Sequence, residues 1–212
     1  LHIILSQKDT GKTHSIIKPA VKRAKSHNNF PVIITPLIGL TRAVSNQCGI
    51  VNYQDIINGR DATTCDSLAV TINSINKLRL QPILAWCHEI YIDEIDAVLD
   101  AIAMGTVAKT EKFDIYTQLQ SLIQTIQKVV VTSADIDNLC LEQLLQFRSD
   151  ITLYIPRSYL PNHPTIQKLL AKKRVHLYRQ EQNLLDDIVN FVSSGGCAGL
   201  ACDHVKKVHN LV

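Results

Sequence analysis

The sequence predicts an α/β fold, in which a mostly parallel sheet carries helices on both faces. Short apolar runs rich in β-branched residues alternate along the chain with segments whose apolar residues recur at helical spacing. The composition is 46% hydrophobic and 19% charged, which is the balance of a soluble globular chain. The 212 residues can bury one good core and begin a second, and no stretch approaches the length of a membrane span.

Six segments have the short, β-branched character of buried parallel strands. They are residues 1–5, 31–35, 68–72, 89–93, 128–133 and 151–155. Two amphipathic helices are expected to pack on this sheet. The first lies between the fourth and fifth strands and is indicated by Ile115, Leu119, Leu122, Ile123 and Ile126. The second lies between the fifth and sixth strands and is indicated by Leu139, Leu141, Leu144 and Leu145.

The pattern changes after Ile155, where PRSYLPNHP places three prolines in nine residues. Prolines at this density interrupt regular structure and are typical of a linker. We therefore expect a first domain over residues 1–155 and a linker over 156–182. Residues 183–212 begin with a helical pattern that ends at glycines, and a new strand and helix come after it. This order predicts the truncated beginning of a second α/β domain.

The segment SQKDTGKT follows the first expected strand and precedes a helical pattern. A loop in that context directs backbone N–H groups and the positive end of a helix toward a phosphate. Gly11 permits close approach of the backbone, Lys12 can reach the outer phosphates, and the Thr13 hydroxyl can hold Mg²⁺. The sequence therefore predicts a P-loop that binds ATP, formed by Ser6, Gln7, Lys8, Asp9, Thr10, Gly11, Lys12 and Thr13.

Three positions make this loop unusual. Ser6 stands where the common pattern begins with Gly, and a small residue suffices at a strand exit. Asp9 brings a carboxylate close to a polyanion, which bears on how tightly the loop holds ATP. Pro19 is expected to kink the following helix or to end it at Lys18.

A second element, HEIYIDEIDAVLD, places Asp93 and Glu94 at the end of an apolar strand. The carboxyl ends of parallel strands form the binding crevice of such sheets. Asp93 can bind the same Mg²⁺ as Thr13, and Glu94 can orient and deprotonate a water for attack on the γ-phosphate. The alternative is that Asp93, Glu94 and Asp96 only begin an acidic helix, which is commonplace.

A third element, VVVTSADIDN, brings Thr132, Ser133 and Asp135 to the same edge of the sheet. Side chains there could sense the γ-phosphate and transmit the signal through hydrogen bonds. The alternative is a helix cap, because Ser or Asp commonly precedes a helix.

Together these motifs, with ITPLIGLTRAV, YQDI and LAVTINSINKL between them, resemble the motor core of superfamily-2 helicases. They are most similar to herpesvirus-type origin-of-replication-binding proteins and related viral, phage and plasmid replication proteins. The resemblance implies that residues 1–153 are a RecA-like P-loop NTPase domain and that a second such domain follows. Lys12, Thr13, Asp93 and Glu94 would then be the ATPase residues, and Ser133 and Asp135 the coupling element.

The resemblance also implies a nucleic-acid partner, expected to be single-stranded DNA. The residues expected to touch the sugar-phosphate backbone are Thr35, Arg42, Thr71 and Ser74. For Thr71 and Ser74, ordinary turn chemistry at a strand end is an equally good interpretation. An arginine motif that stabilises the transferring phosphoryl group would lie beyond Val212, so slow turnover is expected of this chain.

We therefore expect an ATP- and Mg²⁺-dependent helicase or translocase that acts in DNA replication. The alternative functions are a replication initiator or packaging ATPase that binds DNA without unwinding it, and a degenerate P-loop scaffold. The six cysteines lie scattered in apolar or mixed segments, which favours free thiols and an intracellular location. The spacing of Cys197, Cys202, His204 and His209 fits no common zinc site.

The net charge of +3 does not by itself indicate a nucleic-acid partner. Two basic clusters are more local, and solvated helix faces are the favoured interpretation of each. The clusters are Lys18, Lys22, Arg23 and Lys25, and Lys168, Lys172, Lys173 and Arg174. Trp86 and Tyr91 are expected in the core, and His88 is expected to pack rather than to catalyse.

Overall fold

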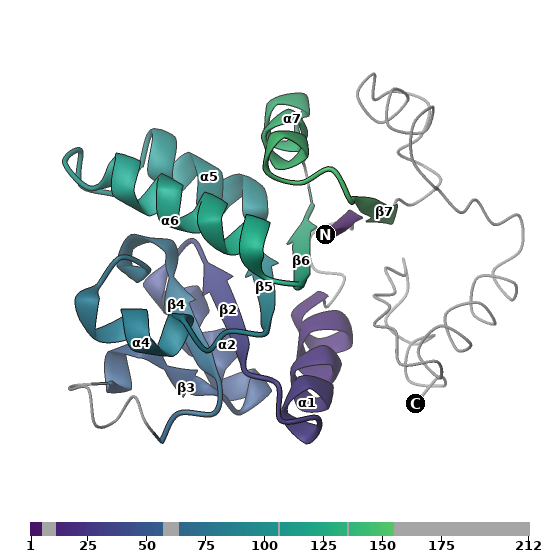
Figure 1. Cartoon of the computed structure of the whole chain (residues 1–212), viewed down its shortest axis with the longest axis vertical. Helices are drawn as coiled ribbons and strands as arrows, with labels where there is room; N and C mark the ends of the chain where they lie inside the picture. Colours follow the sequence, from purple (N-terminus) through teal and green to yellow (C-terminus); the bar gives the residue numbers. More distant parts are fainter. Residues whose placement is uncertain (6–11, 57–63, 106, 135, 155–212) are drawn as a thin grey trace, which may run out of the picture.

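The computed structural model describes residues 1–5, 12–56, 64–105, 107–134 and 136–154 (Figure 1). The predicted linker and second domain lie outside the described residues, and so do the loop residues Ser6 to Gly11 and Asp135. The zinc spacing near the C-terminus and the later basic cluster also fall outside them. The fold is therefore that of the predicted first domain.

The core of this domain is a seven-stranded sheet in the order β3-β4-β2-β5-β6-β1-β7, and every pairing in it is parallel. The strands are β1 (His2–Leu5), β2 (Pro31–Thr35), β3 (Val51–Asn52), β4 (Leu68–Thr71), β5 (Glu89–Asp93), β6 (Lys128–Ser133) and β7 (Thr152–Tyr154). All six predicted strands are confirmed. The sequence prediction missed β3, because two residues are too short to show any periodicity.

Helices cover both faces of the sheet, as predicted (Figure 1). On one face lie α1 (Lys18–Ser26), which follows the π-helical turn η1 (Thr13–Ile17), and α2 (Ile38–Cys48). On the other lie α4 (Gln81–Leu84), α5 (Ile95–Ala103), α6 (Lys112–Thr125) and α7 (Asn138–Phe147). Short 3₁₀ turns complete the described part: η2 (Tyr53–Asp55), η3 (Ile72–Ser74) and η4 (Leu78–Leu80).

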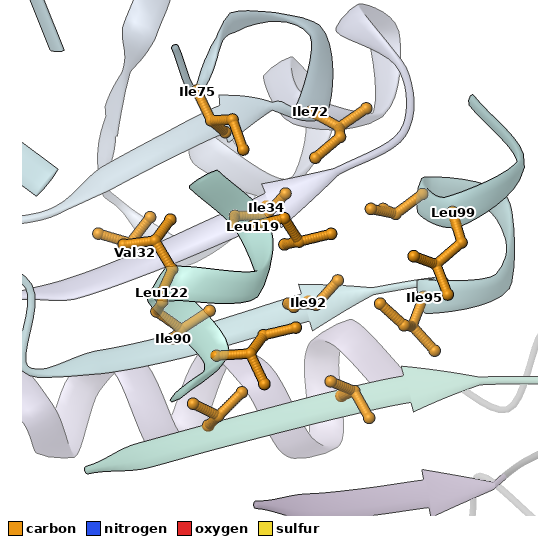
Figure 2. Packing of buried hydrophobic residues seen from close by; sticks show 14 of the residues in the cluster. Val32, Ile34, Ile72, Ile75, Ile90, Ile92, Ile95, Leu99, Leu119 and Leu122 are labelled. Atoms are coloured by element: carbon orange, nitrogen blue, oxygen red, sulfur yellow. The ribbon is translucent and has the colours of Figure 1, made fainter. Parts of the chain in front are cut away.

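Alternate strand residues serve two separate cores, because successive side chains of a strand point to opposite faces. Figure 2 shows Ile90 and Ile92 of β5 in the larger core, where they face Leu119 and Leu122 of α6 and Ile95 of α5. The intervening residue, Tyr91, belongs to the smaller core beneath α1 and α2. Most strand residues are thus buried on one face or the other, which explains why these strands are almost continuously apolar.

Two expectations about the core were wrong. Trp86 is 73% exposed, because it lies in the turn between α4 and β5 rather than in the strand. Leu139 is 64% exposed, because it lies at the first turn of α7 on the side turned away from the sheet. Leu141 and Leu144 are buried and Leu145 is partly buried against the core, as predicted. Tyr91 is fully buried, as predicted.

The amino edge of the sheet holds a buried ionic network around Glu89. Its carboxylate accepts hydrogen bonds from Asn29 at 3.0 Å, from the Tyr91 hydroxyl at 2.5 Å and from Lys128 at 2.6 Å. Next to it, His88 is exposed and its Nδ1 accepts a hydrogen bond from the backbone N–H of Phe30. These bonds tie β5 to β6 and to the segment that enters β2, at the edge opposite to the phosphate loop.

No helix in the described ranges is long and apolar enough to cross a membrane. The cysteines that the structure describes are free thiols, namely Cys48, Cys65, Cys87 and Cys140. Burial raises the pKa of the Cys87 and Cys140 thiols to about 12. Clusters of three or more His, Cys, Asp or Glu side chains that could hold a metal ion are absent from the part of the chain that is described.

Candidate nucleotide-binding site

The sheet order brings three of the predicted motifs to one edge. Strand β6 lies between β1 and β5, with Leu5 paired to Ser133 and Asp93 paired to Thr132. The segments that leave these three strands therefore emerge side by side at the carboxyl edge of the sheet. This is the edge where parallel α/β sheets bind their ligands.

Asp93 is the centre of the site. Its carboxylate is buried and accepts a hydrogen bond from the Thr13 hydroxyl to Oδ2 at 3.1 Å. The other oxygen, Oδ1, accepts one from the Thr132 hydroxyl at 2.7 Å. Two hydroxyls from separate motifs thus hold one carboxylate, and the predicted meeting of Thr13 with Asp93 is present although 80 residues separate them.

The donor set at this point suits a magnesium ion. Mg²⁺ prefers hard oxygen ligands and is commonly held by one or two protein groups together with phosphate oxygens and water. A hydroxyl and a carboxylate oxygen that lie 3.1 Å apart can both turn toward one such ion. Thr13 and Asp93 are therefore the residues that would hold it.

Lys12 and Glu94 form an ion pair beside this carboxylate. The Nζ atom of Lys12 lies 3.1 Å from Oε1 of Glu94, and the two side chains are 6% and 25% exposed. An ammonium group so well buried needs a negative partner, because desolvation of an isolated charge is costly. In this structure Glu94 is that partner, and a nucleotide polyphosphate could replace it.

Glu94 has a left-handed backbone, with φ 58° and ψ 64°, immediately before α5. This region is unfavourable for residues that carry a Cβ, and such strain is concentrated at functional sites. The conformation separates Asp93 in the strand from α5 and leaves the Glu94 carboxylate facing Lys12. The sequence offered no signal for this backbone, because Glu is not a residue that favours it.

The helix after the loop begins with a π-helical turn. The N–H of Lys18 donates to the carbonyl of Thr13, five residues back, and regular α-helix starts at Lys18 with Pro19 at its beginning. Pro19 has no N–H, and in an α-helix its ring would clash with the carbonyl four residues earlier. The wider turn accommodates Pro19, so the helix changes its hydrogen-bonding pattern here and does not end at Lys18.

Ser133 lies at the same edge and its hydroxyl donates to Asp96 at 2.5 Å. This bond links the end of β6 to the first turn of α5, beside the Asp93 carboxylate. The sequence had indicated Asp96 only as an acidic residue of a helix start, and nothing in the local pattern marks it as the partner of Ser133. The coupling role of Ser133 stays a prediction.

The residues expected to contact nucleic acid differ in accessibility. Thr35, Thr71 and Ser74 are buried. The Thr35 hydroxyl is 2.5 Å from that of Thr41, and Thr71 donates to Ser74 at 3.3 Å. These bonds favour the alternative of strand-end turn chemistry. Arg42 is exposed on α2, with one long hydrogen bond to Gln54 at 3.5 Å. Contact with a nucleic acid stays a prediction for all four expected residues.

Comparison with known proteins adds evidence on the fold. No family profile and no curated protein sequence matches this chain. Among solved structures, a hypothetical ATP-dependent RNA helicase from Sulfolobus tokodaii is 12% identical, with a TM-score of 0.52 over 89% of this chain and 62% of that chain. The DUF1998 helicase MrfA, solved with DNA and AMPPNP, is 13% identical, with a TM-score of 0.51 over 73% of this chain and 24% of its own.

A third structure is the genome packaging NTPase B204 of Sulfolobus turreted icosahedral virus 2 in complex with ATP-γS. It is 13% identical over 81% of this chain and 79% of its own, with a TM-score of only 0.42. At these identities the first two similarities show a shared fold, which is the RecA-like P-loop NTPase fold of helicase motor cores. This chain spans less than two thirds of either helicase. The more specific likeness to herpesvirus-type origin-binding proteins stays a prediction.

Proposed function

We propose that this chain belongs to an ATP-dependent nucleic-acid motor that hydrolyses ATP with Mg²⁺ to move along or unwind DNA. One observation carries the proposal. Thr13 meets Asp93, and Lys12 meets Glu94, at the carboxyl edge of a parallel sheet. A loop lysine, a metal-binding pair and a carboxylate that can act as a general base are the parts that phosphoryl transfer to water requires. The fold is also the one found in two helicase structures.

Each residue has a distinct role in this proposal. Lys12 would turn from Glu94 to the phosphates, because a polyphosphate offers the ammonium more negative charge than one carboxylate does. That exchange would free Glu94 to accept a proton from the attacking water. Thr13 and Asp93 would hold Mg²⁺, which when bound neutralises part of the phosphate charge.

The remaining parts of the proposal concern the partner and the process. We propose that Ser133, through Asp96, transmits the state of the site to the adjoining elements. The partner is single-stranded DNA in a replication system, as the motif resemblance implies, and residues 183–212 begin the second motor domain. A role as an initiator or packaging ATPase would share the same hydrolytic residues and would differ in the absence of unwinding.

The central experiment compares ATP hydrolysis with and without single-stranded DNA for wild type, Glu94→Gln and Glu142→Gln. Glu142 is exposed on α7, so its substitution makes the same chemical change away from the site. We expect Glu94→Gln to lower the hydrolysis rate by at least ~100-fold, which is the usual contribution of a general base, and Glu142→Gln to leave it unchanged. Unwinding of a forked duplex then separates a helicase from an initiator.

The motor proposal fails if no nucleic acid stimulates the wild type and Glu94→Gln hydrolyses ATP as fast as wild type. Because slow turnover is expected, binding is measured independently as the shift in melting temperature that Mg²⁺ and ATP produce. A wild-type chain that shows no such shift would contradict nucleotide binding itself.

A further inference from the structure

The charges of this chain are divided along the sequence. Residues 10–54 contain no Asp or Glu, and their cationic residues are Lys12, Lys18, Lys22, Arg23, Lys25 and Arg42. Residues 93–142 have the opposite balance, with nine acidic residues against three lysines. The three lysines are Lys109, Lys112 and Lys128. A net charge of only +3 conceals this separation.

The fold places the stretch without acids on one face of the sheet. Helices α1 and α2, which lie in the stretch without acids, pack on one face of the sheet and contact each other. Helices α5, α6 and α7, which lie in the acidic stretch, pack on the other face (Figure 1). The sheet therefore separates a basic side, formed by α1 and α2, from the side of α5, α6 and α7, where charges of both signs occur and Lys77 and Arg79 also lie.

Three cations of the basic side are exposed to solvent, namely Lys18, Lys22 and Arg42. We call these three residues the basic face. Lys18 and Lys22 are four residues apart on α1, so their charges lie about one turn apart and repel each other. Neither forms a salt bridge within the described ranges, whereas Lys25 on the same helix pairs with Asp66 at 2.9 Å. A helix that carries two mutually repelling lysines, neither with an acidic partner, is suited to bind an external anion.

We propose that the basic face binds the phosphate backbone of nucleic acid, so that the contact expected of Arg42 extends to Lys18 and Lys22 of α1 and does not depend on the buried strand-end residues. Arg42 lies on α2, which begins just beyond the carboxyl end of β2, so the basic face reaches from that edge along α1. Cations spread over two helices suit a long polyanion, and such contacts are independent of base sequence. This inference rests on the proposed function for the identity of its partner.

Charge and polarity favour nucleic acid over a membrane surface. Binding of a helix to an anionic membrane needs apolar side chains beside the basic ones, which insert between the lipids. All of α1 is described, and none of its large apolar side chains is exposed. Along α1 the basic face therefore offers electrostatic attraction without a hydrophobic anchor. The exposed large apolar side chains near Arg42 are Leu37 and Ile38, which lie only at the start of α2.

The test measures binding of the 212-residue chain to a duplex DNA over a range of salt concentrations. The variant is Lys18→Gln with Lys22→Gln, and the matched control is Lys109→Gln with Lys112→Gln, which removes the same charge from the start of α6 and the turn before it, on the other side of the sheet. Each lost phosphate contact lowers the slope of log affinity against log salt by about 0.9. The slope for the variant should therefore be shallower than that for wild type by about 1.8. The ratio of wild-type to variant affinity should then fall about tenfold between about 50 and 200 mM salt.

The control should retain the wild-type slope, and circular dichroism melts should show all chains folded. Equal slopes for variant, control and wild type would overturn the proposal. Binding of the wild type to phosphatidylserine vesicles, or to an acidic protein such as polyglutamate, without binding to DNA would overturn the choice of partner. DNA-stimulated hydrolysis with an unchanged slope would reject only this inference, whereas a changed slope without any ATP hydrolysis would reject only the motor function.

Discussion

Replacement of Thr132 by Val tests the centre of the site. The Thr132 side chain is fully buried and donates to Oδ1 of Asp93 at 2.7 Å, while Thr13 occupies Oδ2. Valine has nearly the same shape as threonine and lacks the donor. The substitution therefore removes one hydrogen bond from a buried carboxylate with little change in packing.

The magnitude follows from the charge and burial of the acceptor. Hydrogen bonds to ionised groups contribute about 1.5–3 kcal/mol, and Thr132 is too deeply buried for water to replace the hydroxyl. We expect Thr132→Val to lower the free energy of unfolding by about 2 kcal/mol. For a domain of this size the melting temperature should fall by about 4–8 °C.

The same change should weaken Mg²⁺ binding at the proposed metal site. Loss of a group that orients a metal ligand typically lowers metal affinity by about 10–100-fold. Urea unfolding gives the stability, and a titration of Mg²⁺ at saturating ATP gives the concentration for half-maximal thermal stabilisation. Thr132→Ser keeps the donor and loses a buried methyl group, so about 1 kcal/mol of destabilisation is expected without a change in the Mg²⁺ requirement. Thr125→Val removes an exposed hydroxyl from α6 and should change stability by less than about 0.5 kcal/mol.

Two outcomes would refute this reasoning. If Thr132→Val is as stable as wild type within about 0.5 kcal/mol, the hydrogen bond to Asp93 does not form in solution. If stability falls and the Mg²⁺ requirement is unchanged, Asp93 is not the ligand that Thr132 positions.

Three further predictions concern the backbone and the ionic network. Pro19→Ala should allow a regular α-helix in place of the π-helical turn, so we expect stability to be kept or to rise by up to about 3 kcal/mol while Mg²⁺-dependent ATP binding weakens. An unchanged nucleotide-induced thermal shift would show that the turn does not position Thr13. Glu94→Gly and Glu94→Ala both remove the base, and Gly should be more stable than Ala by about 1 kcal/mol in urea unfolding, because only Ala retains the left-handed strain; equal stabilities would argue against that backbone. For Glu89, burial alone would raise the pKa, but the hydrogen bonds from Lys128 and Tyr91 outweigh it and lower the pKa. The stability from this group is therefore present above the unfolded pKa and is lost as the pH falls through the folded one. Tyr91→Phe should cost about 2 kcal/mol at neutral pH and progressively less below about pH 4, and a cost independent of pH would contradict the ionised pairing.

Much of the fold follows from local pattern. The strands are short apolar runs whose residues are buried on one face or the other, so composition alone marks them. The amphipathic spacing of Ile115, Leu119 and Leu122 marks α6 because one stripe of that helix packs on the sheet. Patterns of this kind say nothing about Trp86, whose exposure depends on where a turn places it.

The candidate site divides in the same way. Lys12, Thr13, Asp93 and Glu94 could be proposed from sequence, because each belongs to a short motif that follows a strand and the carboxyl ends of parallel strands share an edge. Whether Thr35 is accessible could not be proposed, since its burial depends on the position of α2 and on the hydroxyl of Thr41.

By itself, therefore, the sequence determined the α/β class, the positions of six of the seven described strands and the types of residue at the phosphate loop, because these depend on local chemistry. Only the tertiary structure decided the pairing of Thr132 with Asp93 and of Ser133 with Asp96, which depends on β6 lying between β1 and β5. It also decided that the stretch without acids forms one side of the sheet, since strand order and helix placement bring together residues that are distant along the chain.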